Sequence, residues 1–261
     1  MPALGVVDGG SLMGALGTSA VFLLLDKTAR PLPKGIEGTA YSAAIPDAWC
    51  YEAGQASFGD LLAWFINAFP RSGNVKDDFA YYDRAAALRS LGAGHVLALD
   101  WWNGCRVPFG DSTLSGLLVG MNMRTTAVDI YRALMESICF GARTIVDLLA
   151  SSGSPIERVV LTGGLAQKND VLMQMLADIL GCSLEIPRLT HPTAIGAAIH
   201  GAVAAGIVAN YSDGAGRFGA TDYRVVEPTT GVFPIYDERY RRYREMSDNR
   251  SVRDVMHALG K

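Results

Sequence analysis

Apolar runs of strand length alternate along the chain with amphipathic segments of helical spacing. The runs that predict strands cover residues 4–7, 20–25, 96–99, 158–161 and 183–186. The segments that predict helices cover residues 57–69, 79–91, 125–151, 168–180, 193–207 and 236–261. Because strands and helices alternate over the second half of the chain, the pattern predicts an α/β fold in which a mixed sheet is flanked by helices.

Local signals refine the ends of these elements. Thr126 and Asp129 have the spacing of a capping box at the start of the helix predicted over 125–151. Gly92 is expected to end the preceding helix, because glycine readily adopts the left-handed conformation of a helix C-terminus. Residues 26–50 are rich in proline and turn residues, which predicts a loop with one further strand.

Composition and charge narrow the class of protein. The chain has 261 residues, of which 49% are hydrophobic and 19% charged, so it can bury a sizeable core and general disorder is excluded. A net charge of −3 argues against nucleic-acid binding as its main role. The longest apolar stretch, residues 20–25, is far shorter than the roughly 20 residues of a membrane helix. The cysteines lack metal-binding spacing, and no signal segment is recognisable, so we expect a cytoplasmic protein with reduced thiols.

Two glycine-containing segments can carry ligand chemistry. Gly163 and Gly164 join a predicted strand to a predicted helix, where backbone can approach a ligand and helix N–H groups are free. A tight turn would produce the same pattern, and no phosphate-binding P-loop sequence occurs. Gly17 and Thr18 lie between apolar runs, where amides and a hydroxyl suit phosphate oxygens, although an ordinary hairpin turn also explains them.

The candidate acids are equally open to structural interpretation. Asp8 follows a predicted strand, so it can serve as a general base, as a metal ligand, or as a turn residue that bonds its own backbone. Glu52 precedes a predicted helix, where a solvated acid is also common. Asp8, Asp100 and the Gly163-Gly164 pair are all predicted to follow strands, and ligands of open α/β sheets collect at the carboxyl ends of strands.

Taken together, several segments resemble the FGGY carbohydrate kinases, and the ribulokinase branch most closely. They include Glu52-Ala53-Gly54-Gln55 within residues 45–57 and Asp100-Trp101-Trp102-Asn103-Gly104 within residues 97–108. Residues 116–136 are similar to the family's C-terminal signature, and residues 161–169 to its adenosine motif. The likeness runs from about residue 4 to residue 244, and the motifs occur in the family's order.

The resemblance implies an actin-like ATPase fold, built on a ribonuclease H-like sheet. Family members have two such domains with the active site between them, so residues 1–225 look like the C-terminal domain alone, followed by a helical tail over 226–261. The activity implied is phosphoryl transfer from ATP, with Mg²⁺, to a ketopentose or related sugar. The N-terminal domain, which carries the first phosphate loop and most sugar contacts, is the implied missing partner, and homodimers are common among relatives.

The family's motifs imply a role for each candidate residue. Asp8 would be the catalytic base, and Glu52 would contact the sugar. The nucleotide would be held by a set of small and polar residues, namely Gly17, Thr18, Gly54, Gly163, Gly164, Lys168 and Asn169. No residue is assigned to a metal, and Asp100 and Arg106 are interpreted as structural.

The sequence departs from the family at positions that bear on these roles. Gly9-Gly10 stands where ribulokinases usually have alanine-histidine, the segment from Asp8 to Gly17 looks short, and Lys168 replaces a common asparagine. A second hypothesis is therefore a non-catalytic nucleotide-binding or interaction domain. Because a facing domain is needed to close the site and exclude water, we expect negligible kinase activity from this chain alone.

Overall fold

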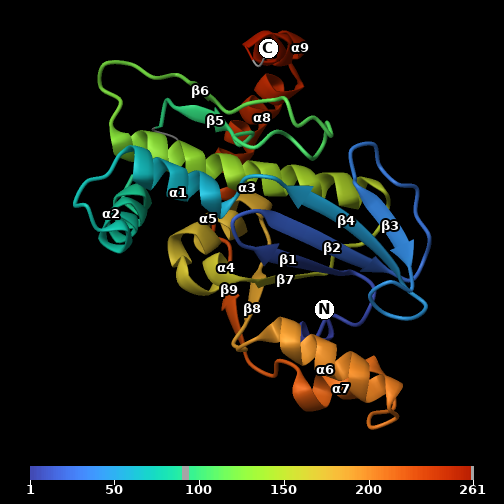
Figure 1. Cartoon of the computed structure of the whole chain (residues 1–261). Coiled ribbons are helices and arrows are strands. Elements are labelled where there is room, and N and C mark those ends of the chain that lie inside the picture. Colours follow the sequence, from blue (N-terminus) through green and yellow to red (C-terminus); the bar gives the residue numbers. More distant parts are fainter. Residues whose placement is uncertain (90–93, 260–261) are drawn as a thin grey trace.

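A mixed sheet with helices on both faces forms the centre of the molecule (Figure 1). The computed structural model describes residues 1–89 and 94–259. Within these ranges the sheet has seven strands in the order β3-β4-β2-β1-β7-β8-β9, where only the β1–β7 and β7–β8 pairs are parallel. The strands are β1 (Ser11–Leu16), β2 (Ala20–Asp26), β3 (Gly38–Tyr41), β4 (Trp49–Gln55), β7 (Arg158–Thr162), β8 (Leu184–Pro187) and β9 (Tyr223–Val226). The predicted fold class is confirmed.

The helices divide between the two faces of the sheet. The long central helix α3 crosses the upper face in Figure 1, and α6 and α7 lie below the sheet. The helices are α1 (Gly59–Ala68), α2 (Val75–Ala87), α3 (Ala127–Ser151), α4 (Gly164–Lys168), α5 (Asp170–Leu180), α6 (Pro192–Ala204), α7 (Tyr211–Phe218), α8 (Phe233–Asp248) and α9 (Arg250–Leu259). None of them is long and apolar enough to cross a membrane, judged over the described ranges.

Alternation along the strands produces two unequal cores. Leu12 and Leu16 of β1 face the large core beneath α3, whereas Met13 faces a smaller cluster on the other side of the sheet. Phe22 of β2 continues the large core opposite Gly14. The predicted capping box is present at the start of α3, where the Thr126 side chain accepts from the backbone N–H of Asp129.

The strand predicted over residues 4–7 is wrong. Residues Pro2–Leu4 form a short 3-10 helix, η1, and the first strand begins only at Ser11. A strand requires partners for its backbone amides, and β1 occupies the place between β2 and β7. η1 instead ends at Gly5 in the left-handed conformation and lies against α6 and α7. As a result, Asp8 comes before a strand and not after one.

Other elements differ in extent or were not predicted. α2 begins several residues earlier than expected because the Asn74 side chain caps it, accepting from the backbone N–H groups of Lys76 and Asp77. The helix ends at Ala87 with Leu88 as its C-cap, so it stops short of the predicted end at Gly92, which itself lies outside the described residues. β1, β4, α7 and β9 were not predicted, and β5 (Leu97–Leu99) pairs with the unpredicted β6 (Leu117–Val119) in a separate two-stranded sheet. Asp100 therefore follows a strand that does not belong to the main sheet.

The C-terminal helices pack onto the core. Tyr236, Tyr240 and Tyr243 of α8 are buried, and Arg239 bonds the buried carboxylate of Glu136 on α3. The remaining arginines of the helix pair with acids of the same helix, as expected of a solvated face. β9, at which the predicted boundary between residues 1–225 and 226–261 falls, belongs to the main sheet. That division of the chain stays a prediction.

Candidate functional site

Two glycine-containing loops meet at the carboxyl ends of the parallel strands β1 and β7. The register pairs Ala15 with Thr162, so the turn formed by residues 17–19 and the Gly163-Gly164 loop leave the sheet side by side. Gly163 has a φ of 101°, and a Cβ added to it would lie 2.2 Å from the carbonyl oxygen of Leu16. Only glycine fits at this contact, and its close fit ties the two loops together.

The 17–19 turn is exposed, but its backbone is held from behind by the start of α1. The amide of Phe58 donates to the carbonyl of Thr18 at 2.9 Å, and the amide of Gly59 donates to the carbonyl of Gly17 at 3.0 Å. A Cβ on Gly59 would lie 2.6 Å from that Gly17 oxygen. Gly17 and Thr18 therefore combine solvent-facing positions with a fixed backbone, which is what a preorganised anion cradle requires.

Gly164 borders open space. It is exposed, and no heavy atom would come within 4 Å of a Cβ placed on it. The packing of the protein therefore does not require glycine here, in contrast to the adjacent Gly163. Lys168 is exposed at the end of the same short helix. A flat backbone surface with a nearby cation can receive a planar, anionic ligand at close range.

Asn169 is already bonded within the protein. Its side-chain oxygen caps α5 by accepting from the amide of Leu172 at 2.9 Å, and its Nδ2 donates to Asp83 at 3.2 Å. Burial raises the pKa of Asp83, and hydrogen bonds from Tyr131 and Asn169 oppose that rise. Asn169 thus positions the helix start next to Gly164, while its side chain is buried and occupied.

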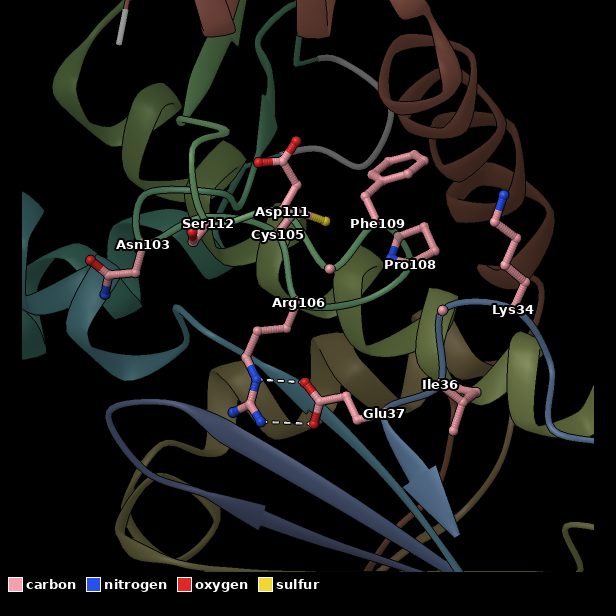
Figure 2. A pocket seen from close by; sticks show the side chains of 12 residues that line it. Lys34, Ile36, Glu37, Asn103, Cys105, Arg106, Pro108, Phe109, Asp111 and Ser112 are labelled. Atoms are coloured by element: carbon pink, nitrogen blue, oxygen red, sulfur yellow. Dashed lines mark hydrogen bonds and ion pairs between the residues drawn. The ribbon is translucent and has the colours of Figure 1, made fainter. Parts of the chain in front are cut away.

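Gly54 makes room for a side chain of the protein itself. A Cβ on Gly54 would lie 2.8 Å from the guanidinium carbon of Arg106. Arg106 donates in turn to both carboxylate oxygens of Glu37, at 2.5 and 2.7 Å (Figure 2). Glu52, two residues before Gly54, is exposed on the same face of β4. Arg106 therefore has the structural role expected of it, because it forms an ion pair with Glu37. Glu37 was not among the residues singled out from the sequence.

A cavity of about 370 Å³ opens beside this ion pair (Figure 2). It lies between residues 34–37 and residues 103–112. Phe109 and Asp111 on its wall are held by α9, where Arg253 lies over the Phe109 ring and His257 bonds Asp111 at 2.8 Å. The cavity thus adjoins the Gly54 side of the site and is braced by the C-terminal helix.

Asp8 does not join this site. The residue precedes β1, so it lies at the amino edge of the sheet, while the glycine loops lie at the carboxyl edge. The six residues of β1 separate the two edges by about 20 Å. Its carboxylate pairs with Lys27 at 3.7 Å, and both side chains are 73% exposed. The expectation that Asp8 follows a strand, as the Gly163-Gly164 pair does, is wrong, because the strand expected over residues 4–7 does not form.

Metal ligands are not gathered at this edge. Over residues 1–89 and 94–259, no group of three or more His, Cys, Asp or Glu side chains is arranged to hold a metal ion. Mg²⁺ in nucleotide sites is usually bound through substrate phosphates and only one or two carboxylates, so it does not need such a group.

Sequence reasoning missed a buried polar network directly behind the site. Gln55, Asp100 and Tyr243 come from three segments far apart in the chain and meet in the core. Gln55 and Asp100 both belong to motifs of the family resemblance. Nothing in the sequence indicates that Tyr243 of α8 bonds Asp100. A helix with 3.6-residue periodicity does not reveal which distant acid a buried tyrosine will bond.

Comparisons with known proteins identify the family of this site. A family model described as "FGGY family of carbohydrate kinases, C-terminal domain" matches residues 12–205. A protein named ribulokinase from Anoxybacillus flavithermus is 35% identical, and the match covers 99% of this chain and 48% of that protein. A ribulokinase from Mycolicibacterium smegmatis is also 35% identical, over 94% of this chain and 45% of that protein. The chain thus spans about half the length of these relatives.

Solved structures share the fold at lower identity. Xylulose kinase from Rhodospirillum rubrum superposes with a TM-score of 0.83 at 22% identity, covering 98% of this chain and 50% of that one. Glycerol kinase from Plasmodium falciparum, solved with ADP, gives a TM-score of 0.77 at 21% identity, covering 95% and 48%. The sheet order, the glycine loops and these similarities together assign the actin-like ATPase fold. The chain belongs to the FGGY family of carbohydrate kinases, as a C-terminal domain of that family.

Proposed function

We propose that this chain is the nucleotide-binding half of an ATP-dependent sugar kinase of the ribulokinase type. The observation that carries the proposal is the contrast at the carboxyl edge of the sheet. Gly163 is required by packing, whereas Gly164 next to it faces open space beside the rigid 17–19 turn. Ligands of open α/β sheets bind at this edge, and a glycine that borders open space there lets a ligand approach the backbone closely.

The nucleotide would lie across both loops. The backbone and hydroxyl of Gly17 and Thr18 would hold the β- and γ-phosphates, and the nucleoside would lie on Gly164 with Lys168 beside it. Asn169 would act indirectly, by fixing the start of α5. Mg²⁺ would be bound through the phosphates of the nucleotide.

The acceptor would be a ketopentose or related sugar, contacted from this chain by the exposed Glu52. A general base must lie within hydrogen-bond reach of the hydroxyl it deprotonates, and Asp8 at the far edge is not placed for that role. We infer that the base and most sugar contacts come from the half of the relatives that this chain does not span. Cytoplasmic location and homodimerisation remain predictions.

Substitution of Gly164 tests the nucleotide site. Gly164→Ala adds a methyl group where no protein atom lies within 4 Å, so the protein should fold with unchanged stability. Calorimetric titration with ADP and Mg²⁺ should show binding to the original chain and at least a tenfold loss in the variant, since the methyl group would keep the ligand off the backbone. Gly201→Ala in α6, which also faces open space, is the matched control and should bind normally. Equal affinity of all three proteins would contradict the site.

A non-catalytic binding domain is the competing function, because the chain spans only half of its relatives. Kinase turnover with ATP, Mg²⁺ and a panel of ketopentoses distinguishes the two. The chain alone should be inactive under both hypotheses. Addition of the N-terminal half of a ribulokinase should restore measurable phosphorylation only if this chain is a catalytic half.

A further inference from the structure

Three buried polar side chains meet behind the 17–19 turn. The Tyr243 hydroxyl donates to Asp100 Oδ1 at 2.7 Å, and Gln55 Nε2 donates to Asp100 Oδ2 at 2.7 Å. Gln55 Nε2 also donates to the carbonyl of Ile138 on α3 at 3.0 Å. Gln55, Asp100 and Tyr243 are only 5%, 4% and 3% exposed. We call these three residues the Asp100 network.

The Asp100 network adjoins the glycine turn directly. Gln55 pairs with Ala20 on the last rung of the β2–β4 ladder, and Ala20 is the residue that follows the 17–19 turn. Residues 58 and 59, just after Gln55, donate the backbone bonds that hold the carbonyls of Thr18 and Gly17. A shift of Gln55 would therefore move both ends of the turn.

The segment that carries Asp100 also supports the start of α1. The amide of Asn103 donates to Ser57 Oγ at 3.1 Å, and Asn103 Nδ2 donates to Asp60 Oδ2 at 2.6 Å. Residues 100–103 thus form hydrogen bonds with both ends of the strand–helix junction of residues 55–60. The arrangement links α8 through Asp100 to the turn that the nucleotide would occupy.

A structural role alone does not favour a carboxylate at this position. Burying an acid costs free energy, and apolar residues of similar volume usually stabilise a core at least as well. In addition, Gln55 Oε1 is buried without a hydrogen-bond partner among the described residues, a further cost. Helix α3 approaches so closely that a Cβ on Gly141 would lie 2.5 Å from Gln55 Nε2. The network is tightly confined and costly, which is typical of positions kept for function.

We propose that Asp100 is a positioning residue for the nucleotide: by accepting from Gln55 and Tyr243 at once, it holds the last rung of the β2–β4 ladder and so sets the shape of the Gly17-Thr18 turn. This inference rests on the proposed function of the turn. Asp100 is buried away from solvent, so it acts through Gln55 and the backbone of residues 55–59.

Two simultaneous bonds require the ionised carboxylate. Burial raises the pKa of Asp100 to about 6, against the lowering effect of the bonds from Tyr243 and Gln55. The titratable groups facing it are Tyr243 of α8 and Cys105 of the following loop, and burial raises the pKa of each, so both stay neutral at pH 5–8. When Asp100 is protonated, one of its oxygens carries the hydrogen and no longer accepts. One of the two hydrogen bonds, from Tyr243 or from Gln55, is then lost. Nucleotide affinity should therefore fall as the pH drops through about 6.

The test is the pH profile of ADP binding, measured by calorimetric titration with ADP and Mg²⁺ from pH 5.5 to 8. Asp100→Asn has one acceptor oxygen at every pH, so it should bind on the order of tenfold more weakly at pH 7.5 and with a flatter profile. The matched control is Asp78→Asn. Asp78 is a similarly buried acid in the first turn of α2 that accepts from Ser72 in the loop after α1. The terminal phosphate of ADP titrates identically in every sample, so differences between profiles belong to the protein.

Tyr243→Phe provides an independent readout that does not require the loss of the acid. The Tyr243 bond lowers the pKa of Asp100, so its removal should raise that pKa and move the midpoint of the affinity loss to higher pH. A merely structural role would leave the midpoint unchanged. If the original chain binds ADP but Asp100→Asn and Tyr243→Phe reproduce its profile, the positioning role is overturned and the nucleotide site stands. If the original chain does not bind ADP at any pH, both fail.

Discussion

The two edges of the main sheet differ in how they use their polar groups. At the carboxyl edge of β1 and β7, the backbone is pinned from behind while Gly17, Thr18 and Gly164 face solvent. At the amino edge, the acids are neutralised locally: Asp8 pairs with Lys27, and the buried Asp26 accepts from Arg30 and Ser154. At the carboxyl edge, exposed backbone on a rigid frame remains free to bind a ligand. At the amino edge, the acids already have partners within the protein. In this sheet, the candidate ligand site is therefore marked by the backbone positions that packing leaves exposed.

The largest effect should come from Gly163→Ala. The residue has a φ of 101°, and the new Cβ would lie 2.2 Å from the Leu16 carbonyl oxygen, so backbone must move. We expect a loss of about 3 kcal/mol or more in the free energy of unfolding, measured by urea denaturation. Gly164→Ala, one residue later, should leave that free energy within about 0.5 kcal/mol. Similar losses in both variants would remove the distinction between a packed and an open glycine.

The pH dependence of stability should have opposite signs for two buried acids, Asp100 and Asp26. The pKa of Asp100 is raised to about 6, so the folded state holds a proton that the unfolded state releases, and its contribution to stability falls as the pH rises from about 4 to 6. The pKa of Asp26 is lowered, because hydrogen bonds from Thr28, Ser154 and Arg30 outweigh its burial. The stability that ionised Asp26 contributes is therefore lost as the pH falls below the ordinary pKa of an aspartate.

Urea denaturation of Asp100→Asn and Asp26→Asn at several pH values measures both effects. The stability of the original chain relative to Asp100→Asn should fall by up to about 3 kcal/mol between pH 4 and 7. Relative to Asp26→Asn it should instead rise with pH. Parallel curves would mean that the two carboxyl groups have similar environments, contrary to the structure.

Gly141→Ala should destabilise the protein by about 2 kcal/mol, although alanine normally favours a helix interior over glycine. The added Cβ would lie 2.5 Å from Gln55 Nε2 and 2.6 Å from Asp100 Oδ2, so the Asp100 network would have to separate. Gly201→Ala in α6 has open space and should stabilise by up to about 1 kcal/mol. Thermal unfolding followed by circular dichroism compares the pair. A stabilising Gly141→Ala would show that α3 does not confine the network.

Asp8→Ala should produce the smallest effect. An exposed pair with Lys27 contributes within about 0.5 kcal/mol, so stability should hardly change, and ADP affinity should be unaffected. Kinase activity of the complemented enzyme should also survive. A loss of several orders of magnitude in turnover, with stability intact, would restore Asp8 as the catalytic base and show that residues 8–10 rearrange in the complete protein.

Periodicity and turn residues predicted the helices at the centre of the chain well. The capping box of Thr126 and Asp129 and the apolar face behind it are local features, and α3 begins where they indicate. The glycine loops were also found from local signals, since Gly163-Gly164 joins a strand to a helix and Gly17-Thr18 lies between apolar runs. The strand assigned to residues 4–7 was wrong because an apolar run does not show whether a neighbouring strand is free to pair.

By itself, the sequence determined the alternation of strands and helices, the positions of the glycine loops and the motifs that place the chain in its family. Tertiary structure alone decided which edge of the sheet each candidate faces, that Gly163 is packed while Gly164 is open, and that Gln55, Asp100 and Tyr243 share one buried network. The physical reason is the range of the interactions. Turns, caps and amphipathic faces depend on neighbours a few residues away, whereas the β1–β7 pairing and the bonds of the Asp100 network join residues more than 40 positions apart.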